Sequence, residues 1–533
     1  MRITGSWSIA SLVLAFVAFA TPVIRAEDDL LMRSTVQVEL GQDRGQSLGS
    51  LFEAAAGDGS LVVGAGFCDV FNTHLRMDRH VLQFFVRLAG DQQPYELEPL
   101  PRPSSASGTY LFSLRDRVIA VPGSGATEAR VLDEAANSWR DGEGATWDRV
   151  MLAGAELAMG DSRFYYDGNL ILDAPEEGSY QRFYYANGHL FFYHVNRGEE
   201  SVYRPWESDE NGFSKLYACP WDPADGGGVD LSQALVLTLS IVGETTFSWG
   251  QSEGLVMTGS NIGGLYAFDG DEWRIVREPS LGASFQVYTM VQYYDRLLLG
   301  QYPTGEFFAF EGDRLERLEG WPPRLDGVSP SARECQTAMV WGGELIAGVW
   351  PWGELWRHDG VSDEWETMGR LFTHPDVHEA PIHPYQAEAE ERGDVLNQWG
   401  QRITSMVPFG DSLLISTATK WPFEPEPAPE FMTSEQLDEY GRVWRLRVPG
   451  CVSAPIDWTA GATEFEFVVT ATELQIWQDG RELVSTPLPN DLATQIAQSK
   501  APREVQWGAG AYGPFGGVAV RGAIEPQLQS HTE

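Results

Sequence analysis

One segment of this sequence occurs three times, and this repeat restricts the possible fold more than any other feature. It reads GGLYAFDGDEW from Gly263, GEFFAFEGDRL from Gly305 and GELWRHDGVSDEW from Gly353, in steps of 42 and 48 residues. A short apolar run precedes each copy, at residues 255–257, 297–299 and 345–347. Each unit therefore predicts a buried strand, a glycine break, an alternating aromatic strand, a tight turn and an outer strand.

A repeat of this length, with several strands in each unit, is typical of a β-propeller blade. One four-stranded blade cannot bury both of its faces, so blades stack on their neighbours and close into a ring. Weaker turn-and-strand units precede residue 250, and GDSLLIST…YGRVWRLRVPG follows residue 372. The sequence therefore predicts an all-β propeller of seven blades, with six or eight as alternatives.

The units resemble kelch-type blades. In AMVWGGELIAGVWPWGELWRHDGVSDEWE, a Gly-Gly pair precedes the aromatic Trp356, and Asp359 stands six positions before Trp365. Asp133 and Trp139 repeat that last spacing. The resemblance implies the fold and no particular activity, because propellers serve both binding and catalysis.

The C-terminal part has a different pattern. FEFVVTATELQIWQDGRELVSTPLP alternates apolar and polar residues around an Asp-Gly turn, as a β-hairpin does, and VQWGAGAYGPFGGVAVRGAIEP predicts another strand pair. Together they resemble half of a laminin-G or concanavalin-like module. Three interpretations are open: a truncated sandwich, a small β-module packed on the ring, or strands that help to close the ring. We favour the last two.

The N-terminus predicts export. Arg2 precedes an apolar core at Ile9–Ala20, and a cleavage site near Ala26 follows, which is typical of a signal peptide. An uncleaved anchor is the alternative, and no later stretch predicts a transmembrane helix. The mature protein is therefore expected to be secreted or extracytoplasmic. The expected organisation is a signal peptide at 1–26, a linker at 27–44, the propeller at 45–449, a small β-module at 450–526 and a tail at 527–533.

The charge is strongly acidic, with 37 basic and 76 acidic residues and a formal net charge of −39. Such a surface repels nucleic acid and anionic lipid, and it disfavours polyanionic polysaccharides unless cations gather locally. Solubility or a salty habitat would also explain the composition. Only three lysines are present, Lys215, Lys420 and Lys500.

The four cysteines, Cys68, Cys219, Cys335 and Cys451, have no C-x-x-C spacing, so a zinc ribbon is unsupported. Export permits disulfides, and four cysteines allow three pairings. A link from Cys451 back into the propeller is attractive because this residue directly follows the last blade.

Two clusters contain residue types suited to catalysis. YQRFYYANGHLFFYHVNRGEESVYR supplies His189, His194, Tyr203 and Arg204, and it is similar in residue types to what propeller-fold polysaccharide lyases need. In such lyases a Tyr or His moves protons while an Arg neutralises a carboxylate. Alternation places the two histidines on opposite faces, and aromatic packing is the competing explanation.

The second cluster is FCDVFNTHLRMDRHVLQFF. Period-two alternation places its candidate residues on one face of an extended segment: His74, Arg76, Asp78 and His80. Salt bridges within the fold are the competing explanation.

Three histidines, His374, His378 and His383, lie within ten residues and are weak candidates for a metal site. Prolines break any helix there, so a turn role is the alternative. No cofactor is predicted, with calcium or zinc left open.

Aromatic residues near strand ends suggest a ligand surface, since sugar faces stack on aromatic rings. The candidates are Tyr302, Trp350, Trp352, Trp356 and Trp421. The leading hypothesis is an exported propeller that binds an extracellular ligand, a carbohydrate above all, at its rim or axial pocket. A polysaccharide lyase or glycoside hydrolase is the alternative, and a protein-interaction scaffold is the third. Whether the protein is catalytic stays undecided, with a slight preference for binding alone.

Overall fold

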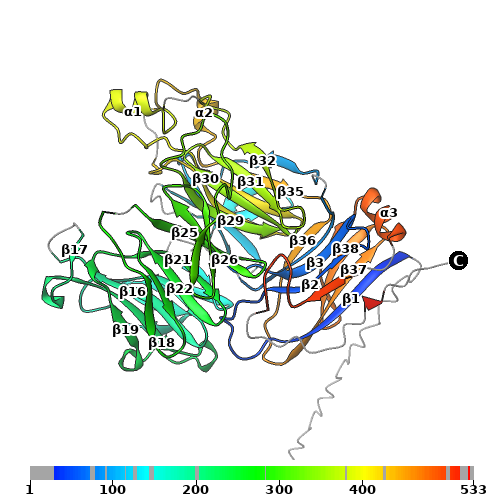
Figure 1. Cartoon of the computed structure of the whole chain (residues 1–533), viewed down its shortest axis with the longest axis horizontal. Coiled ribbons are helices and arrows are strands. Elements are labelled where there is room, and N and C mark those ends of the chain that lie inside the picture. Colours follow the sequence, from blue (N-terminus) through cyan, green and yellow to red (C-terminus); the bar gives the residue numbers. More distant parts are fainter. Residues whose placement is uncertain are drawn as a thin grey trace, which may run out of the picture.

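The computed structural model describes residues 29–72, 79–90, 93–114, 116–123, 129–142, 149–198, 203–282, 284–377, 381–423, 428–499, 504–515 and 526–527. The predicted signal peptide lies outside these ranges. The fold consists almost entirely of antiparallel strands (Figure 1). Its α-helices are short: α1 (Gln386–Arg392), α2 (Ser434–Leu437) and α3 (Asn490–Gln498). Within the described ranges, no helix has the length and apolar character needed to cross a membrane.

Among the described residues, six four-stranded antiparallel sheets, and four successive strands of one five-stranded sheet, have the strand order of a propeller blade, and we call them S1 to S7. S1 contains β7 (Thr109–Leu114), β8 (Arg117–Pro122), β9 (Arg130–Asp133) and β10 (Ser138–Asp141). S2 contains β11 (Arg149–Leu152), β12 (Ala155–Gly160), β13 (Arg163–Tyr166) and β14 (Asn169–Leu172). S3 contains β15 (Ser179–Ala186), β16 (His189–Asn196), β18 (Phe213–Pro220) and β19 (Leu235–Thr238). A short pair, β17 (Arg204–Pro205) and β20 (Ile241–Val242), accompanies S3.

The repeat found in the sequence builds the next three sheets. S4 contains β21 (Thr246–Ser252), β22 (Leu255–Ser260), β23 (Leu265–Phe268) and β24 (Trp273–Arg277). S5 contains β25 (Gln286–Tyr293), β26 (Arg296–Tyr302), β27 (Phe307–Glu311) and β28 (Arg314–Arg317). S6 contains β29 (Glu334–Trp341), β30 (Glu344–Trp350), β31 (Glu354–Asp359) and β32 (Glu364–Arg370). S7 contains β33 (Arg402–Phe409), β34 (Ser412–Ala418), β35 (Val443–Arg447) and, as its outer strand, β6 (Glu96–Pro99).

The seven sheets follow one another around a closed ring. Strand β6 precedes S1 in the chain but completes S7, so the first and last sheets are tied together by backbone pairing. Buried apolar clusters connect S1 to S2, S2 to S3, S3 to S4, S4 to S5, and S5 through S6 to S7. Leu111 of S1 shares a further cluster with Leu414 of S7, which completes the circle. The all-β propeller predicted from the repeat is therefore confirmed.

The Asp–Trp spacing marks equivalent turns. The carboxylate of Asp359 accepts a hydrogen bond from the Val361 backbone N–H at 2.9 Å in the turn between the third and fourth strands. Asp133 and Asp269 accept equivalent bonds in S1 and S4. Trp139 and Trp273 donate their indole N–H to backbone carbonyls next to the outer strand of the preceding sheet, at 2.7 and 3.0 Å. The kelch assignment itself stays a prediction.

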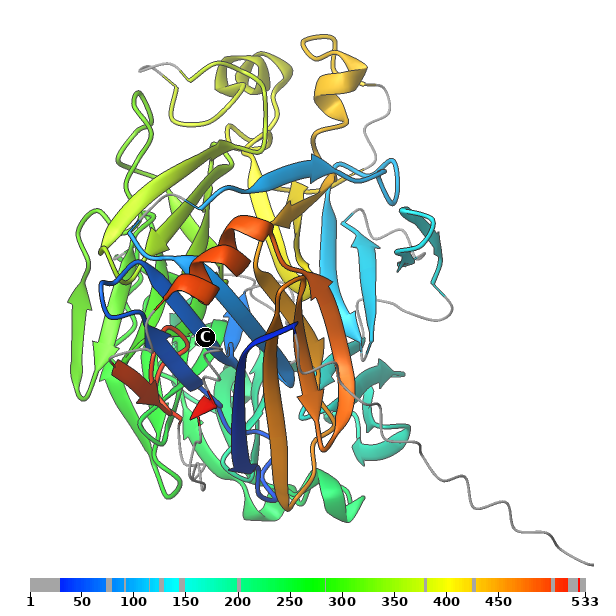
Figure 2. The same ribbon diagram turned by 90° about the vertical axis from the view of Figure 1, so that its right-hand side faces the viewer.

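A β-sandwich lies against one side of the ring, in front of it in Figure 2. One sheet has the order β36 (Cys451–Pro455), β5 (Val81–Leu88), β3 (Leu61–Phe67), β2 (Ser50–Ala55), β40 (Glu504–Trp507). The other has the order β39 (Arg481–Pro487), β38 (Glu473–Gln478), β37 (Ala462–Thr470), β1 (Leu30–Glu39), β41 (Pro526–Gln527). Both sheets contribute to one buried apolar core, for example through Phe84 and Phe467, whose rings lie 5.2 Å apart.

Strand pairing cuts across the domain bounds expected from the sequence. The segment expected to be a linker, 27–44, contains β1, which pairs along β37. Strands β2, β3 and β5, from the start of the expected propeller, share the other sheet with β36 and β40, so that start belongs to the sandwich. The physical reason is burial, because the alternating apolar residues of β1 need a facing sheet, and the C-terminal strands supply it. The laminin-G resemblance stays a prediction.

The sandwich also reaches the inner edge of the ring. Strand β4 (Val70–Asn72) leaves the sandwich and pairs with β25, the first strand of S5. The Asn72 side chain accepts hydrogen bonds from Thr289 and from the Ala338 backbone N–H, at 2.5 and 3.1 Å, so it joins S5 to S6. Arg87 of β5 is buried and forms an ion pair of 2.8 Å with Asp359 of S6. Ring and sandwich are thus continuous in their packing.

All four cysteines are buried and free. Cys451 does contact the propeller, since a Cβ added to Gly342 would lie 2.5 Å from its sulfur. This contact is apolar packing, and the disulfide considered from the sequence does not form because the facing turn offers glycine instead of cysteine.

Candidate functional site

Hollows in the described part of the chain lie along the junction of ring and sandwich, and three of them bear on function. The largest of these three, about 630 Å³, is a charged groove between the sandwich and S1–S2. Its polar lining includes Arg44, Asp116, Asp167, Asp457, Arg481 and Glu482. A much smaller inner pocket shares His80, Met151 and Gly154 with this groove. On S5 and S6, a third hollow of about 350 Å³, the aromatic cleft, faces the loop at residues 506–514.

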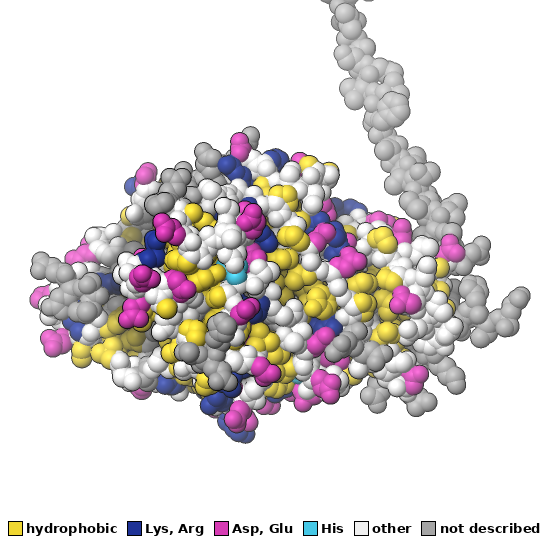
Figure 3. Space-filling model, turned by 90° about the horizontal axis from the view of Figure 1, so that it is seen from above, with side chains coloured by type: hydrophobic (Ala, Val, Ile, Leu, Met, Phe, Trp, Pro, Cys, Tyr) yellow, Lys and Arg dark blue, Asp and Glu magenta, His cyan; other side chains and the backbone are white. Residues whose placement is uncertain are grey.

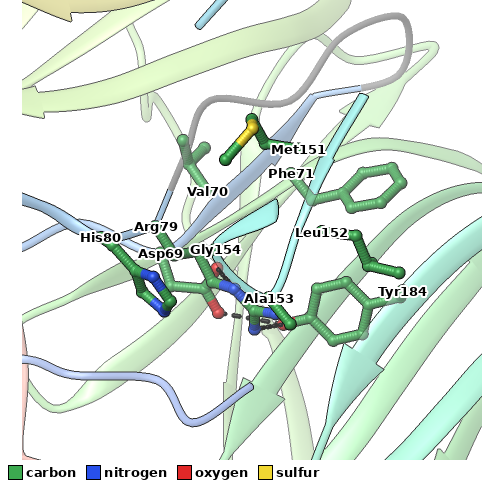
Figure 4. Close-up of a pocket in the computed structure, with 10 residues that line it drawn as sticks. All are labelled: Asp69, Val70, Phe71, Arg79, His80, Met151, Leu152, Ala153, Gly154 and Tyr184. Carbon is green, nitrogen blue, oxygen red and sulfur yellow. Dashed lines mark hydrogen bonds and ion pairs between the residues drawn. The ribbon is translucent and has the colours of Figure 1, made fainter. Parts of the chain in front are cut away.

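The inner pocket holds the one described member of the predicted His74–His80 cluster (Figure 4). The His80 ring stacks on Trp458 at 4.5 Å, and its Nε2 lies 2.9 Å from the Arg44 carbonyl. His74, Arg76 and Asp78 lie outside the described residues. Their alignment with His80 on one face therefore stays a prediction.

Next to His80, an ionic cluster joins the sandwich segment to S3. Tyr184 donates its hydroxyl to Asp69 at 3.0 Å, and Arg79 donates to the Gly45 carbonyl at 2.8 Å. Burial raises the pKa of the Asp69 carboxyl, although Arg79 and Tyr184 both oppose this. Burial, followed by the Asp69 charge, also raises the pKa of Tyr184. Tyr184 is therefore a hydrogen-bond donor here, and a poor general base.

The predicted cluster on S3 is not brought together. His189 packs against Phe268 of S4, whereas His194 packs against Tyr180 and Phe213 on the other face of β16. This separation follows the alternation expected from the sequence. Burial is the main cause that lowers the pKa of His194, so its imidazole is neutral at pH 7.

The remaining two members of that cluster are engaged elsewhere. Tyr203 accepts a hydrogen bond of 2.6 Å from the Asn261 amide. Arg204 donates to the Arg197 carbonyl at 3.1 Å. Both contacts are with neighbouring loop residues, which favours a structural role for the predicted lyase-like set.

The aromatic residues predicted to bind sugar differ in accessibility. Trp350 and Trp352 are almost fully buried, at 1 and 0% exposure, so neither can stack on a ligand from solvent. Trp356 is also buried. Burial contradicts ligand stacking at these three rings. The long insertion after S6 covers two of them: Trp352 donates to the Ile382 carbonyl, and His383 lies on Trp350. Tyr302 is half-buried, and Trp421 is 58% exposed.

Two insertions, one with α1 between β32 and β33 and one with α2 between β34 and β35, stand together at one end of the ring, where α1 and α2 are labelled in Figure 1. His374 fastens them: its Nδ1 lies 2.6 Å from the Tyr385 hydroxyl and its Nε2 lies 2.8 Å from the Gln436 carbonyl. His378 lies outside the described residues. Within the described ranges, no group of three or more His, Cys, Asp or Glu side chains is placed to hold a metal.

The aromatic cleft contains residues that sequence reasoning missed as a site. Its walls include Tyr294, Asp295, Arg296, Trp321, His358 and Asp363. The guanidinium of Arg296 lies over the Trp321 ring at 5.6 Å, and that ring contacts His358 at 4.1 Å between centroids. Asp295 and Asp363 are mostly exposed at the edge, so charged acceptors surround an apolar floor.

His358 fixes the floor of this cleft. It is buried, with Nδ1 at 3.1 Å from the Tyr293 hydroxyl and Nε2 at 3.2 Å from Asp363. Burial lowers the pKa of His358 to about 4, against the opposing effect of Asp363. The imidazole is therefore neutral at pH 7 and holds both neighbours by ordinary hydrogen bonds.

One local signal marked this place in the sequence. Hairpins between the first two strands use Asn187-Gly188 in S3 and Glu253-Gly254 in S4, which suits turns that need positive φ. In S5 the corresponding turn begins with Tyr294, a bulky residue at φ 52°. Non-glycine residues with positive φ are uncommon and concentrate at functional sites. A tyrosine in such a turn is therefore a pointer to function.

Comparison with known proteins gives no family. No protein-family model matches the chain, and no curated protein matches it. Among solved structures, YCF48 bound to D1 peptide is 13% identical and covers 67% of this chain and 96% of its own, with a TM-score of 0.35. The extracellular domain of the putative one-component system BT4673 from B. thetaiotaomicron is 10% identical, covers 74% and 47%, and has a TM-score of 0.37. The Cps50 (Swd1) β-propeller domain of Myceliophteria thermophila is 10% identical, covers 67% and 100%, and has a TM-score of 0.34.

Proposed function

We propose that the protein is exported and binds an extracellular carbohydrate in the aromatic cleft. The observation that carries the proposal is the pair of half-buried rings, Trp321 and Tyr294, in a hollow of about 350 Å³. That volume is within the range of small-ligand pockets, which combine apolar walls with a few polar groups. Because Trp350 and Trp352 are buried, we place the proposed site in the aromatic cleft, whereas the sequence hypothesis placed it at the propeller rim or axial pocket.

The polar edge of the cleft suits a sugar. Arg296 offers donors, while the exposed carboxylates of Asp295 and Asp363 offer acceptors for hydroxyl groups. The His358 hydrogen bonds keep the floor in one geometry, which reduces the ordering that binding requires. An aromatic floor with charged planar groups at its edge can thus contact both the C–H face and the hydroxyl groups of a saccharide.

The test is binding of purified protein to a panel of neutral and uronate polysaccharides, by affinity electrophoresis and titration calorimetry. Trp321→Ala should weaken binding of the retained glycan at least tenfold, since stacked aromatic residues dominate such contacts. Trp206→Ala is the matched control, because this exposed ring lies outside the cleft. Equal affinities of wild type and a folded Trp321→Ala variant would refute the cleft as the site.

A polysaccharide lyase or hydrolase is the second candidate function. It is favoured by His80, Arg79 and Tyr184, which meet in the inner pocket at the end of the charged groove. The protein would be incubated with the same panel while absorbance of unsaturated sugar ends and reducing ends is followed. Both signals, lost in His80→Ala, would establish a lyase, and reducing ends alone would indicate a hydrolase. If neither signal appears but the glycan retains the protein, binding without catalysis is supported. If neither signal nor retention appears, a protein-interaction scaffold is favoured.

A further inference from the structure

A chain of contacts crosses five successive sheets at the beginnings of their first strands. The rings of Phe247 in S4 and Tyr288 in S5 stack at 4.9 Å. Tyr288 hydrogen-bonds to Glu334 in S6, and Glu334 forms an ion pair of 3.3 Å with Arg402 in S7. Arg402 in turn hydrogen-bonds to Tyr110 in S1. These residues come from strand beginnings, so they surround the same end of the ring, and we call them the rim belt.

The belt contains more positive than negative charge. Glu334 is buried and forms ion pairs with two cations, Lys420 at 2.6 Å and Arg402 at 3.3 Å. His383 lies beside Lys420, and burial with that positive charge lowers the pKa of the imidazole to about 4, so it adds no charge at pH 7. One carboxylate therefore faces two cations, in a protein whose formal net charge is −39.

Several buried donors near these cations lack a partner within the described part of the chain. They are Arg402 Nε, Trp350 Nε1 and the amide of Gln336, both of whose polar atoms are unpaired. Gln336 is 1% exposed and is the extra residue of a β-bulge two positions after Glu334. Buried polar groups are normally paired, so unpaired donors beside a surplus positive charge indicate a missing acceptor. Bulges also redirect side chains next to functional sites.

The site can be approached from solvent on the Lys420 side. The Lys420 side chain keeps 11% of its exposure, and its ammonium lies 4.5 Å above the Trp350 ring. Trp421, the next residue, is largely exposed. In the view from above, acidic and basic side chains are interspersed with apolar ones over this end of the molecule (Figure 3). Lys420 is therefore a partly buried cation next to an accessible aromatic ring.

We propose that the Lys420–Arg402 pair binds an oxyanion group of a small ligand, the carboxylate of a sugar acid or a sulfate ester. A planar or tetrahedral oxyanion would accept from the Lys420 ammonium and from Arg402 Nε, the nitrogen of that guanidinium that does not bond to Glu334 or to the Lys420 carbonyl, and it would displace neither cation from Glu334. This site is separate from the aromatic cleft, and it stands independently of carbohydrate binding there. Charge-assisted bonds of this kind are among the strongest polar contacts in proteins.

The experiment is calorimetric titration of the full chain with glucuronate, glucose 6-sulfate, inorganic sulfate and, as the neutral analogue, glucose. Lys420→Met should weaken binding of the charged ligands about 10- to 100-fold, and Lys420→Arg should retain most of it. Lys215→Met is the matched control, because Lys215 also pairs with a single carboxylate, Asp209, but on S3. Thermal unfolding of each variant reports whether the fold is retained.

The outcomes separate the sources of the oxyanion. Binding of glucuronate but not of glucose 6-sulfate assigns a carboxylate ligand, and the reverse assigns a sulfate ester. Inorganic sulfate should compete for the site in either case. The proposal is overturned if none of the charged ligands binds, if glucose binds as well as glucuronate, or if folded Lys420→Met binds like wild type. If Lys420→Met does not fold, loss of binding in a folded Arg402→Gln variant provides the same test, and its unchanged affinity would refute the site.

Discussion

Sheets S6 and S4 hold a buried carboxylate at the same point of the repeat but compensate its charge differently. In S6 the second residue of GELW is Glu354, which is fully buried. It accepts from the Arg333 guanidinium at 3.2 and 3.3 Å, from the Trp356 indole at 3.2 Å and from the Leu325 backbone N–H at 3.1 Å. The carboxylate is thus both hydrogen-bonded and neutralised.

In S4 the corresponding residue is Gly264, and the carboxylate arrives from another segment. Glu244, just before β21, fills the space: a Cβ added to Gly264 would lie 2.2 Å from its Oε1. Tyr266, which corresponds to Trp356, donates its hydroxyl to Glu244 at 2.7 Å. The Glu244 Oε2 atom is buried and has no hydrogen-bond partner in the described part of the chain. Among the described residues, no arginine pairs with Glu244 as Arg333 pairs with Glu354 in S6.

The difference shows that the fold preserves an arrangement, an aromatic donor facing a carboxylate, while the chain position of the acid can change. The electrostatic consequence is large. Burial raises the pKa of Glu244 from 4.5 to about 7, with Ser260 and Tyr266 only partly opposing it. S4 therefore holds a carboxyl that takes up a proton near neutral pH, where S6 holds an ion pair.

The largest expected effect comes from breaking the S6 pair. Arg333→Met would leave Glu354 buried without its cation, and this should reduce the free energy of unfolding by about 3–5 kcal/mol. Urea denaturation at pH 7 measures the change. A loss below about 1 kcal/mol would mean that the remaining donors suffice and that the contrast with S4 is unimportant.

The second effect is the pH dependence that Glu244 gives to S4. The folded-state pKa of Glu244 is raised, so its contribution to stability is present below the unfolded-state pKa of 4.5 and is lost as pH rises through about 7. The side chain in Glu244→Gln cannot ionise. Raising the pH from 5 to 9 should therefore lower the free energy of unfolding of wild type by about 3 kcal/mol more than that of this variant. Denaturation series at the two pH values give the comparison, and parallel curves for both proteins would contradict it.

A smaller effect is expected from the aromatic donor. Tyr266→Phe removes the hydroxyl that lowers the pKa of Glu244, so the carboxylate becomes still harder to ionise. The loss in stability should be about 1–2 kcal/mol at pH 9 and smaller at pH 5, because a bond to a charged acceptor is stronger. An equal loss at both pH values would show that the hydroxyl serves packing alone.

The smallest effect belongs to S5, the intermediate case. Glu306 accepts from Arg317 at 2.6 Å and from the Gly320 backbone N–H at 3.0 Å, but the arginine is 49% exposed. Solvent screens this pair, so Arg317→Met should reduce the free energy of unfolding by less than about 1 kcal/mol. A loss as large as that of Arg333→Met would show that burial does not set the ranking of the three sheets.

The sequence predicted the repeated parts well and the site poorly. The apolar runs and Asp–Trp spacings located the strands and turns of S4 to S6, because these depend on local patterning. Trp350 and Trp352 looked equally suitable for ligand binding, yet they are covered by an insertion whose position depends on His374 and Tyr385. Neither Trp321 nor Tyr294 was predicted as a site residue, because their neighbours in space come from S6 and the sandwich.

By itself, the sequence determined that this protein is an all-β propeller, since a period of about forty residues with alternating strands leaves stacked blades as the way to bury both faces. Tertiary structure alone decided which distant segments pair. Strand β6 completes S7, and β1 joins β37 across more than 400 residues, because the unpaired backbone groups of a strand pair with whichever strand the closed ring brings near. The aromatic cleft and the rim belt exist for the same reason, as each is assembled from side chains that only this closure brings together.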